Sequence, residues 1–174
     1  AVIRFSRLTA AVVEQDFAAV MRDVPLLRAW SGQDWPTPDF TVEENLVDLV
    51  RHDLEHEEGI AFTYSVLLGH DVVGCIYVRP FADALSTRDV EPPDDPQLGS
   101  GTVVRGWAHE VPADELISSS LAEHGGDFGD GARRWWQTNT DCPDQLAACE
   151  RLGLTDRREF RGPTATWVLC AVPE

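Results

Sequence analysis

Residues 60–80, IAFTYSVLLGHDVVGCIYVRP, contain two apolar runs separated by a short polar turn. The first run alternates with period two, which predicts a half-buried strand. Its expected inward side chains are Ile60, Phe62, Tyr64, Val66 and Leu68. The second run, 72–80, is more continuously apolar and predicts a strand covered on both faces. Because the turn at 69–71 is too short for a crossover, the two strands should form an antiparallel hairpin near the centre of a sheet.

The sequence before the hairpin predicts one strand, two helices and an aromatic loop. These are a strand at 2–8, a helix at 9–23, a loop at 29–40 and a helix at 42–58. Thr9 is a plausible N-cap for the first helix. Thr41 and Glu44 have the spacing of a capping box for the second.

The sequence after the hairpin predicts alternating strands and helices. The expected elements are a long acidic loop at 82–100, a strand at 102–108, a helix from Pro112 to the Gly125–Gly126 pair, a strand at 133–139, a helix at 143–153 and a strand at 164–172. Helices between these strands permit parallel pairing. No internal repeat or domain linker is evident, so we expect one α/β (α+β) domain over 1–174, with a single mixed, mostly antiparallel sheet and helices on both faces.

Composition narrows the classes of partner. The chain has 30 acidic and 14 basic residues, a net charge of −16, which repels nucleic acid and attracts cationic amines. It has no apolar run long enough to span a membrane and no signal-peptide pattern at its start, so we expect a cytoplasmic protein without membrane contact. The four cysteines, Cys75, Cys142, Cys149 and Cys170, lack paired spacing and are expected to be free buried thiols.

His52, Glu55 and His56 have the H-x-x-E-H spacing of a zinc peptidase helix. A helical wheel, however, predicts that these three side chains point away from the apolar stripe of the same helix. That stripe contains Val42, Leu46, Val47, Leu49, Val50 and Leu54. We therefore expect a solvated helix surface and no metal, and keep a metal-dependent hydrolase as a third alternative.

Three segments resemble the GNAT superfamily of N-acetyltransferases, over nearly the whole chain. They are the hairpin 67–81, the strand 102–108 and the closing segment QLAACERLGLTDRREF at 145–160. The closing segment carries an apolar helix, an acidic–basic pair, Leu-Gly and an aliphatic residue, at Glu150 to Leu154. The resemblance implies a sheet splayed between the strands near 102–108 and 134–139, with acetyl-CoA in the gap and direct transfer of its acetyl group to an amine.

The resemblance also assigns residues to the cofactor and the substrate. Backbone groups near Trp107 and Ala108, together with Asn139 on the neighbouring strand, would bind the acetyl-CoA arm. Loops 29–40 and 82–100 would form substrate walls. Trp30 and Trp35 would then shape the acceptor pocket, although they can equally serve as lids over the core.

The sequence departs from the family at the pyrophosphate turn. The family has a glycine-rich turn before the helix that follows the fourth strand, whereas this chain reads AHEVPADEL at 108–116. Helix N-terminal amides bind phosphate, but Glu110, Asp114 and Glu115 can satisfy these amides themselves. We therefore expect weak acetyl-CoA binding.

The catalytic residues are less defined. The family commonly has a tyrosine in its last helix that protonates the departing thiolate, and Cys149 occupies that position here. Cys149 also fits an ordinary buried thiol. His109 or Glu110 could be the base that accepts a proton from the amine, and Glu110 is slightly preferred because a carboxylate also attracts a cation.

The sequence thus predicts an acetyl-CoA-dependent N-acetyltransferase that acts on a small, cationic amine. The alternative is a non-catalytic domain of the same fold that has lost efficient coenzyme binding. A homodimer is left open.

Overall fold

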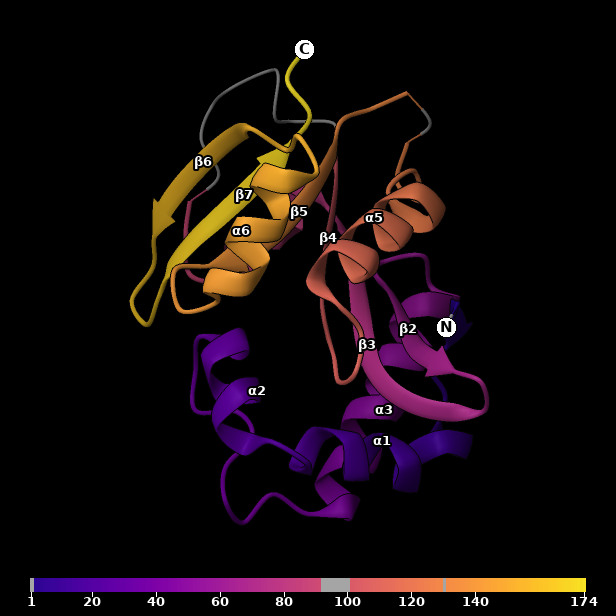
Figure 1. The fold of residues 1–174 in the computed structure, drawn as a ribbon. Coiled ribbons are helices and arrows are strands. Elements are labelled where there is room, and N and C mark those ends of the chain that lie inside the picture. The colour runs from indigo at the N-terminus through magenta and orange to yellow at the C-terminus, as the bar shows by residue number, and fades with distance from the viewer. Residues whose placement is uncertain (1, 92–100, 130) are drawn as a thin grey trace. The chain divides into compact units, whose positions relative to one another are not determined.

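The computed structural model describes residues 2–91, 101–129 and 131–174. The strands are β1 (Ile3–Arg7), β2 (Phe62–Leu68), β3 (Asp71–Pro80), β4 (Thr102–Ala108), β5 (Arg134–Asn139), β6 (Asp156–Arg161) and β7 (Thr166–Ala171) (Figure 1). The helices are the short η1 (Ala10–Val12), α1 (Val13–Met21), α2 (Val24–Ser31), α3 (Val42–Glu57), α4 (Phe81–Ser86), α5 (Ala113–His124) and α6 (Pro143–Arg151). Among the described residues, no helix is both long and apolar enough to span a membrane.

The strands form one sheet in the order β1-β2-β3-β4-β5-β7-β6. The pairs β1–β2, β5–β7 and β6–β7 are antiparallel, whereas β4 and β5 are parallel. The β4–β5 register runs only from Thr102↔Arg134 to Val104↔Trp136, so it covers the first half of each strand. The predicted mixed, mostly antiparallel sheet is confirmed.

The chain divides into two compact units. The first contains Ala1–Tyr77 and Gly106–Val111, and the second contains Val78–Arg105 and Pro112–Glu174. Strands β3 and β4 contribute to both. Within the first unit these two strands approach closely, since a Cβ atom at Gly74 would collide with the carbonyl oxygen of Trp107.

Helix α3 begins as predicted but faces the opposite way. The Thr41 hydroxyl accepts from the Glu44 backbone N–H at 3.2 Å, and the Glu44 carboxylate accepts from the Thr41 N–H at 3.0 Å, which confirms the capping box. The buried residues are Asn45 and Leu49, however, and most of the predicted apolar stripe is exposed. The helical wheel gave the wrong buried side because it considers α3 alone. Polar side chains of α1 and β2 form hydrogen bonds with the polar side of α3, which is therefore the packed side.

Strand β2 is likewise buried on the side that the sequence assigned to solvent. Thr63 and Ser65 are buried, whereas Phe62 and Tyr64 are only half-buried. Thr63 Oγ1 lies 3.2 Å from His52 Nδ1 of α3, so the polar side of the strand packs against the polar side of the helix. The alternation predicted the strand and the burial of Val66 correctly, but it missed the burial of Thr63 and Ser65 and wrongly placed Ile60 inside.

Two short helices were missed. Helix α2 covers the start of the loop expected at 29–40, and Pro25 lies in its first turn, where the missing N–H has no cost. Asp23 caps α2, since its carboxylate accepts from the Leu26 N–H at 3.1 Å. Helix α4 occupies the start of the loop expected at 82–100, and residues 92–100 of that loop lie outside the described residues.

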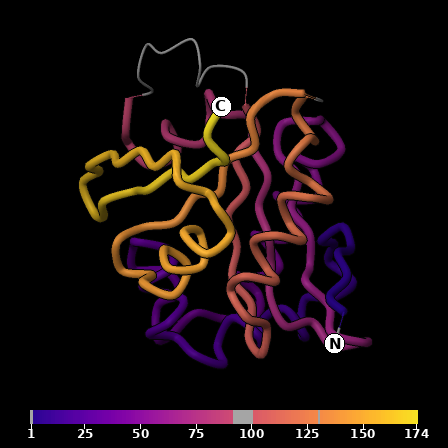
Figure 2. Tube along the Cα trace, turned by 45° about the horizontal axis from the view of Figure 1, so that its top comes forward, coloured from indigo at the N-terminus to yellow at the C-terminus, as the bar shows by residue number. Residues whose placement is uncertain are grey.

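The second unit has its own apolar core and its own helix pair. Helices α5 and α6 lie side by side (Figure 1), and the chain closes with the β6–β7 hairpin, drawn in yellow in Figure 2. The core on the α4 side consists of Phe81, Ala84, Leu85, Val90, Val103, Trp135, Trp167, Leu169 and Ala171. All nine side chains come from the second unit, so this core forms within that unit.

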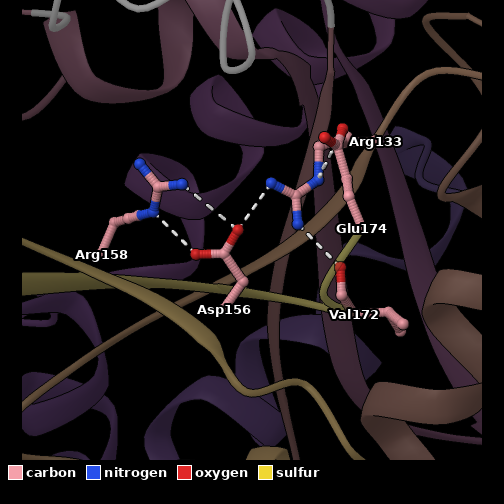
Figure 3. Close-up of polar contacts among 5 residues, drawn as sticks. All are labelled: Arg133, Asp156, Arg158, Val172 and Glu174. Carbon is pink, nitrogen blue, oxygen red and sulfur yellow. Dashed lines mark hydrogen bonds and ion pairs between the residues drawn. The ribbon is translucent and has the colours of Figure 1, made fainter.

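An arginine–aspartate network ties the strand ends of the second unit together (Figure 3). Asp156 accepts from Arg133 Nη1 at 2.6 Å and from Arg158 Nε at 2.7 Å, while Arg133 Nη2 donates to the Val172 carbonyl at 2.7 Å. The hydrogen bonds from Arg158 and then Arg133 lower the pKa of Asp156. Arg133 also lies 4.4 Å from the centroid of the Trp135 ring. The network fixes the chain around the start of β5 and the end of β7.

Replacing a buried leucine of α5 tests how this helix packs in the second unit. Leu116 is buried in the first turn of α5 and is 2% exposed. We expect Leu116→Ala to lower the free energy of unfolding by about 2–5 kcal/mol, since it removes buried methyl groups and leaves a cavity. Urea denaturation measures the change, with Leu146→Ala on the half-buried side of α6 as a milder comparison. A loss below about 0.5 kcal/mol for Leu116→Ala would contradict the packing of α5 described above.

Candidate active site

His109 lies just after β4 in the first unit and is held at three points. Its Nε2 lies 2.8 Å from the Ala19 carbonyl of α1, and its backbone N–H donates to the Val73 carbonyl at 2.8 Å. Its ring lies 5.6 Å from that of Trp107. Because a carbonyl only accepts, Nε2 carries the hydrogen, and in neutral imidazole the lone pair is then on Nδ1. His109 is thus an oriented, 9% exposed imidazole with a basic nitrogen directed away from its anchor.

Glu110, the preferred base in the sequence analysis, has a different environment. Its backbone has φ of 60°, in the left-handed region, and its side chain is largely exposed. Its carboxylate pairs with Arg22 Nη1 at 3.3 Å. The turn therefore brings His109 inward and turns Glu110 toward an arginine at the surface.

Aromatic side chains surround the end of β4. Trp107 is buried, and its Nε1 donates to the Tyr77 hydroxyl at 3.4 Å. The Tyr77 ring stacks on Trp30 of α2 at 5.4 Å and meets the His52 ring edge-on at 5.6 Å. Tyr77 therefore connects Trp30 to Trp107, the residue that the sequence analysis assigned to the cofactor. The sequence analysis did not single out Tyr77.

The aromatic loop continues this cluster. Trp35 contacts Trp30 at 6.3 Å and Phe40 at 5.9 Å, and Phe40 contacts Phe17 of α1 at 6.0 Å. Trp30 is buried and Trp35 is half-buried. The two tryptophans predicted for the acceptor pocket are thus joined to Tyr77 in one aromatic row, and their role in binding stays a prediction.

Asp16 is a buried carboxylate that the sequence analysis missed. It is 3% exposed, and its Oδ2 accepts from Asn45 Nδ2 of α3 at 2.9 Å. Its Oδ1 has no hydrogen-bond partner within the described parts of the chain. Burial raises the pKa of Asp16 to about 6, with an added effect of the Asp48 charge, and the Asn45 hydrogen bond only partly offsets it.

The neighbours of Asp16 on β3 are a thiol and a phenol. Burial raises the pKa of Cys75 and of Tyr77, and the charge of Asp16 raises both further. Both groups are therefore neutral hydrogen-bonding groups in the physiological range. A sequence signal did exist, since Asp16 has helical spacing with Val13, Phe17 and Val20 and so interrupts an apolar face.

The predicted cofactor residues are distributed over both units. Trp107 and Ala108 end β4 in the first unit. Asn139 ends β5 in the second, where it is fully buried and its Oδ1 accepts from the Asp141 N–H at 2.8 Å. Asn139 thus holds the turn into α6, and its contact with a cofactor stays a prediction.

The N-terminus of α5 is the predicted pyrophosphate turn. Pro112 is its N-cap residue and makes no side-chain cap. Asp114 is bound by Arg151 of α6, whose Nη2 and Nε lie 2.6 and 3.0 Å from the two carboxylate oxygens. The Arg151 hydrogen bond lowers the pKa of Asp114. The carboxylate of Asp114 is therefore neutralised by an arginine that the sequence analysis did not pair with it.

Cys149, the expected position of a thiolate-protonating group, is buried in α6. Its thiol hydrogen-bonds with Cys170 of β7, and this bond and then burial raise the pKa of Cys149. The residue therefore behaves as the buried apolar thiol that was its other interpretation. Cys75, Cys149 and Cys170 are free and buried, as predicted, whereas Cys142 is only half-buried.

The H-x-x-E-H residues are not on a solvated face. His52 contacts Thr63 and Tyr77, and the His56 ring lies 4.6 Å from Phe62 and 5.4 Å from Tyr64. The prediction that they point into solvent was wrong, for the same reason as the facing of α3. In the part of the chain that the structure describes, no three His, Cys, Asp or Glu side chains are grouped to hold a metal.

Solved structures share this fold. AAC(6')-Ib in complex with ribostamycin and coenzyme A matches with a TM-score of 0.71 at 9% identity, over 100% of this chain and 94% of that chain. RimL, a ribosomal L7/L12 alpha-N-protein acetyltransferase in complex with coenzyme A, matches at 0.64 and 14%, over 98% and 93%. MccE, a microcin C7 self-immunity acetyltransferase in complex with acetyl-CoA and AMP, matches at 0.66 and 10%, over 97% and 91%. No protein-family model and no curated protein matches the chain. The chain therefore has the fold of these acetyltransferases.

Proposed function

We propose that this chain is a divergent GNAT acetyltransferase that transfers an acetyl group from acetyl-CoA to the amine of a small, cationic acceptor. The observation that carries the proposal is the match over nearly the full length of three acetyltransferases that were solved with coenzyme A or acetyl-CoA. The parallel β4–β5 pair, whose register covers only the first half of each strand, is consistent with it.

The proposed reaction needs a base on the protein. Bound acetyl-CoA supplies a thioester, whose carbonyl carbon bonds to the amine nitrogen as its carbon–sulfur bond breaks. The amine loses a proton to a base, and the sulfur gains one from solvent, since Cys149 is buried and hydrogen-bonded to Cys170. The products are an amide and free coenzyme A.

His109 is the base that the geometry favours. A base must have a free lone pair and a fixed orientation, and the Ala19 carbonyl gives His109 both by holding Nε2–H. Glu110 is largely exposed and paired with Arg22. We therefore assign proton acceptance to His109 Nδ1, and the earlier preference for Glu110 is reversed in this proposal.

Charge and aromatic surface support a cationic acceptor. The net charge of −16 attracts cations, and aromatic faces bind ammonium groups. Trp30, Trp35 and Tyr77 provide such faces within the first unit. Among the structural neighbours, AAC(6')-Ib was solved with the aminoglycosides ribostamycin and kanamycin, which agrees with an amine acceptor.

The N-terminus of α5 fits an anionic group better than its sequence suggested. A helix N-terminus offers free N–H groups and a positive dipole end to phosphate. Pro112 makes no side-chain cap, and Arg151 neutralises Asp114. The amides of Ala113 and Glu115 would hold the pyrophosphate, with Glu115 as the remaining unfavourable charge.

The Asp114–Arg151 pair gives a binding prediction. We expect Arg151→Gln to weaken coenzyme A binding by about two- to fivefold, because it leaves the Asp114 charge at the helix N-terminus without its partner. Asp114→Asn should strengthen binding by a similar factor. Isothermal titration of coenzyme A measures both, with Arg157→Gln on β6 as a control for loss of one positive charge. Equal affinities in all four proteins would contradict the placement of the pyrophosphate at α5.

Coenzyme binding separates the enzyme from its alternative. The lack of a glycine-rich turn and the burial of Cys149 favour a non-catalytic binding domain as the second candidate. A ligand that binds only the native state raises the melting temperature with concentration. We expect acetyl-CoA to raise it and AMP alone to raise it much less. No shift with acetyl-CoA up to millimolar concentration would reject the proposed enzyme and favour the second candidate.

A further inference from the structure

The His109 imidazole is held from two directions within the first unit. Its backbone N–H donates to the Val73 carbonyl of β3, and its Nε2–H donates to the Ala19 carbonyl of α1, each at 2.8 Å. The backbone contact fixes the residue on the sheet, whereas the ring contact fixes which nitrogen carries the hydrogen. The state of the imidazole therefore depends on where α1 lies relative to β3.

Helix α1 is too short to fix that position by itself. It has nine residues, and Val12 at its N-cap makes no side-chain cap hydrogen bond. Isolated helices shorter than about 12–15 residues are marginal in water, so α1 depends on tertiary contacts. The Ala19 carbonyl lies in the last turn, where carbonyl oxygens lack their regular intrahelical partners. Its backbone contact with the Arg22 N–H is long, at 3.4 Å, so the oxygen is available to His109.

A buried hydrogen bond connects α1 to α3 one turn before Ala19. Asn45 Nδ2 donates to Asp16 Oδ2 at 2.9 Å, and both side chains are buried. Asp16 and Ala19 are three residues apart and both buried, so they lie on the same side of α1. A shift of Asp16 therefore moves the Ala19 carbonyl, because a single helical turn joins the two residues.

Helix α3 is itself fixed to the strands of the first unit. His52 contacts Thr63 of β2 at 3.2 Å, and Arg7 of β1 binds Asp53 at 2.8 Å. The contacts thus lead from β1 and β2 through α3 and α1 to His109, which is bonded to β3. The buried hydrogen bond between the two helices is one step of this connection.

We propose that the Asp16–Asn45 hydrogen bond positions His109. It holds α1 in the place where the Ala19 carbonyl accepts from Nε2–H, and so keeps the lone pair of the imidazole on Nδ1. The role of this lone pair in catalysis rests on the proposed acetyltransferase function. The hydrogen bond needs an acceptor oxygen at Asp16 and does not need its charge. Displacement of a reacting group by about 1 Å can lower a rate by about 100-fold, so loss of this bond should lower kcat.

Nitrogen NMR of the histidine side chains tests this positioning in the chain without ligands. Long-range proton–nitrogen correlations distinguish a ring nitrogen that carries a hydrogen from one that does not. His109→Gln identifies the His109 signals by their absence. At about pH 8.5, where an ordinary histidine is neutral, the unmodified chain should show only the Nε2–H tautomer. Asp16→Ala and Asn45→Ala should each show a mixture of the two tautomers. Asp16→Asn should keep Nε2–H, because its amide oxygen can still accept from Asn45.

Acetyl transfer should follow the same pattern, measured with acetyl-CoA and with kanamycin and spermidine as probe amines. We expect kcat to fall about tenfold in both alanine variants and to stay within about threefold in Asp16→Asn. KM for acetyl-CoA should stay within about twofold, since a group that acts only in the transition state changes kcat. Absence of transfer to any amine by the unmodified chain would count against the proposed function, whereas the NMR comparison would still decide the positioning of His109.

Leu49→Ala is the matched control. Leu49 is 2% exposed and follows Asn45 by one turn on the buried side of α3, so its replacement loosens the same packing but leaves the hydrogen bond in place. It should keep the Nε2–H tautomer and the kcat of the unmodified chain. All variants are compared under conditions in which urea denaturation shows them to be folded.

Two outcomes would overturn the positioning role. They are a pure Nε2–H tautomer in both alanine variants, and an equal mixture of tautomers in Leu49→Ala. Should Asn45→Ala not fold, Asn45→Ser takes its place, because the serine hydroxyl is one bond nearer the backbone than the amide and loses its contact with Asp16. A pure Nε2–H tautomer in that variant would contradict the proposal in the same way.

Discussion

Replacing His109 by glutamine is expected to lower kcat for acetyl transfer by about 100- to 1,000-fold, within the range typical of a lost general base. Glutamine can still donate a hydrogen bond to the Ala19 carbonyl, the anchor of Nε2, but has no basic nitrogen in place of Nδ1. Initial rates of coenzyme A release, measured with a thiol reagent at saturating acetyl-CoA, determine the change.

Glu110→Gln is the matched control because Glu110 is the adjacent residue and was the other candidate base. Its side chain is exposed and pairs with Arg22, so we expect its kcat to stay within about threefold of the unmodified chain. The reverse result, a large loss in Glu110→Gln and a small one in a folded His109→Gln, would assign the base to Glu110 instead.

Replacing Asp16 by asparagine is expected to stabilise the protein at pH 8. Burial raises the pKa of Asp16 from 3.8 to about 6 in the folded state, so the folded state holds this proton more tightly than the unfolded state. The stabilisation of the folded state by protonated Asp16 is therefore fully present below about pH 4, and it is lost as the pH rises through about 6. The loss above that window is on the order of 3 kcal/mol. Asparagine stays neutral and its carbonyl can still accept from Asn45.

Urea denaturation at pH 4.5 and pH 8 checks this expectation. The free energy of unfolding of Asp16→Asn should be close to that of the unmodified chain at pH 4.5 and higher than it at pH 8. Asp16→Ala is the control for shape, because it leaves the Asn45 amide without its partner and should destabilise the protein by about 1–3 kcal/mol. A loss of stability in Asp16→Asn at pH 8 would show that the charged carboxylate is satisfied in the fold.

The sheet was largely predictable because its signals are local. The hairpin at 60–80 and the capping box at Thr41 depend on neighbouring residues, and both are present in the structure. The end of the helix predicted at 143–153 is also a local signal, since Gly153 follows α6 with a φ of 76°, which is easiest for glycine. Helices α2 and α4 were missed because each is eight residues or fewer, too short for an apolar period to appear.

The facing of α3 and β2 was not predictable in the same way. Hydrophobicity along one helix says which side is apolar, but the contact of His52 with Thr63 joins residues on two elements. The pairing of Asn45 with Asp16 also spans two helices. Polar groups that satisfy each other can be buried in place of apolar ones, and such pairs become visible only in three dimensions.

The site was partly predictable for a similar reason. His109 could be found from the sequence because it directly follows the clearly predicted strand at 102–108. The aromatic loop could be found from its composition. The tautomer of His109 depends on the distant Ala19 carbonyl, and the neutralisation of Asp114 depends on Arg151, which is 37 residues away. Long-range contacts of this kind decide which of several candidate side chains is available for chemistry.

Acetyl transfer itself is the central claim, and mass spectrometry of the acceptor tests it most directly. The purified chain would be incubated with acetyl-CoA and a panel of small amines, including aminoglycosides and polyamines, with equivalent neutral alcohols as controls. We predict that at least one amine gains a single acetyl group, at a rate that depends on enzyme concentration and is lost in His109→Gln. Saturable binding of acetyl-CoA without acetylation of any amine in the panel would contradict the enzyme assignment and favour a non-catalytic domain of the same fold.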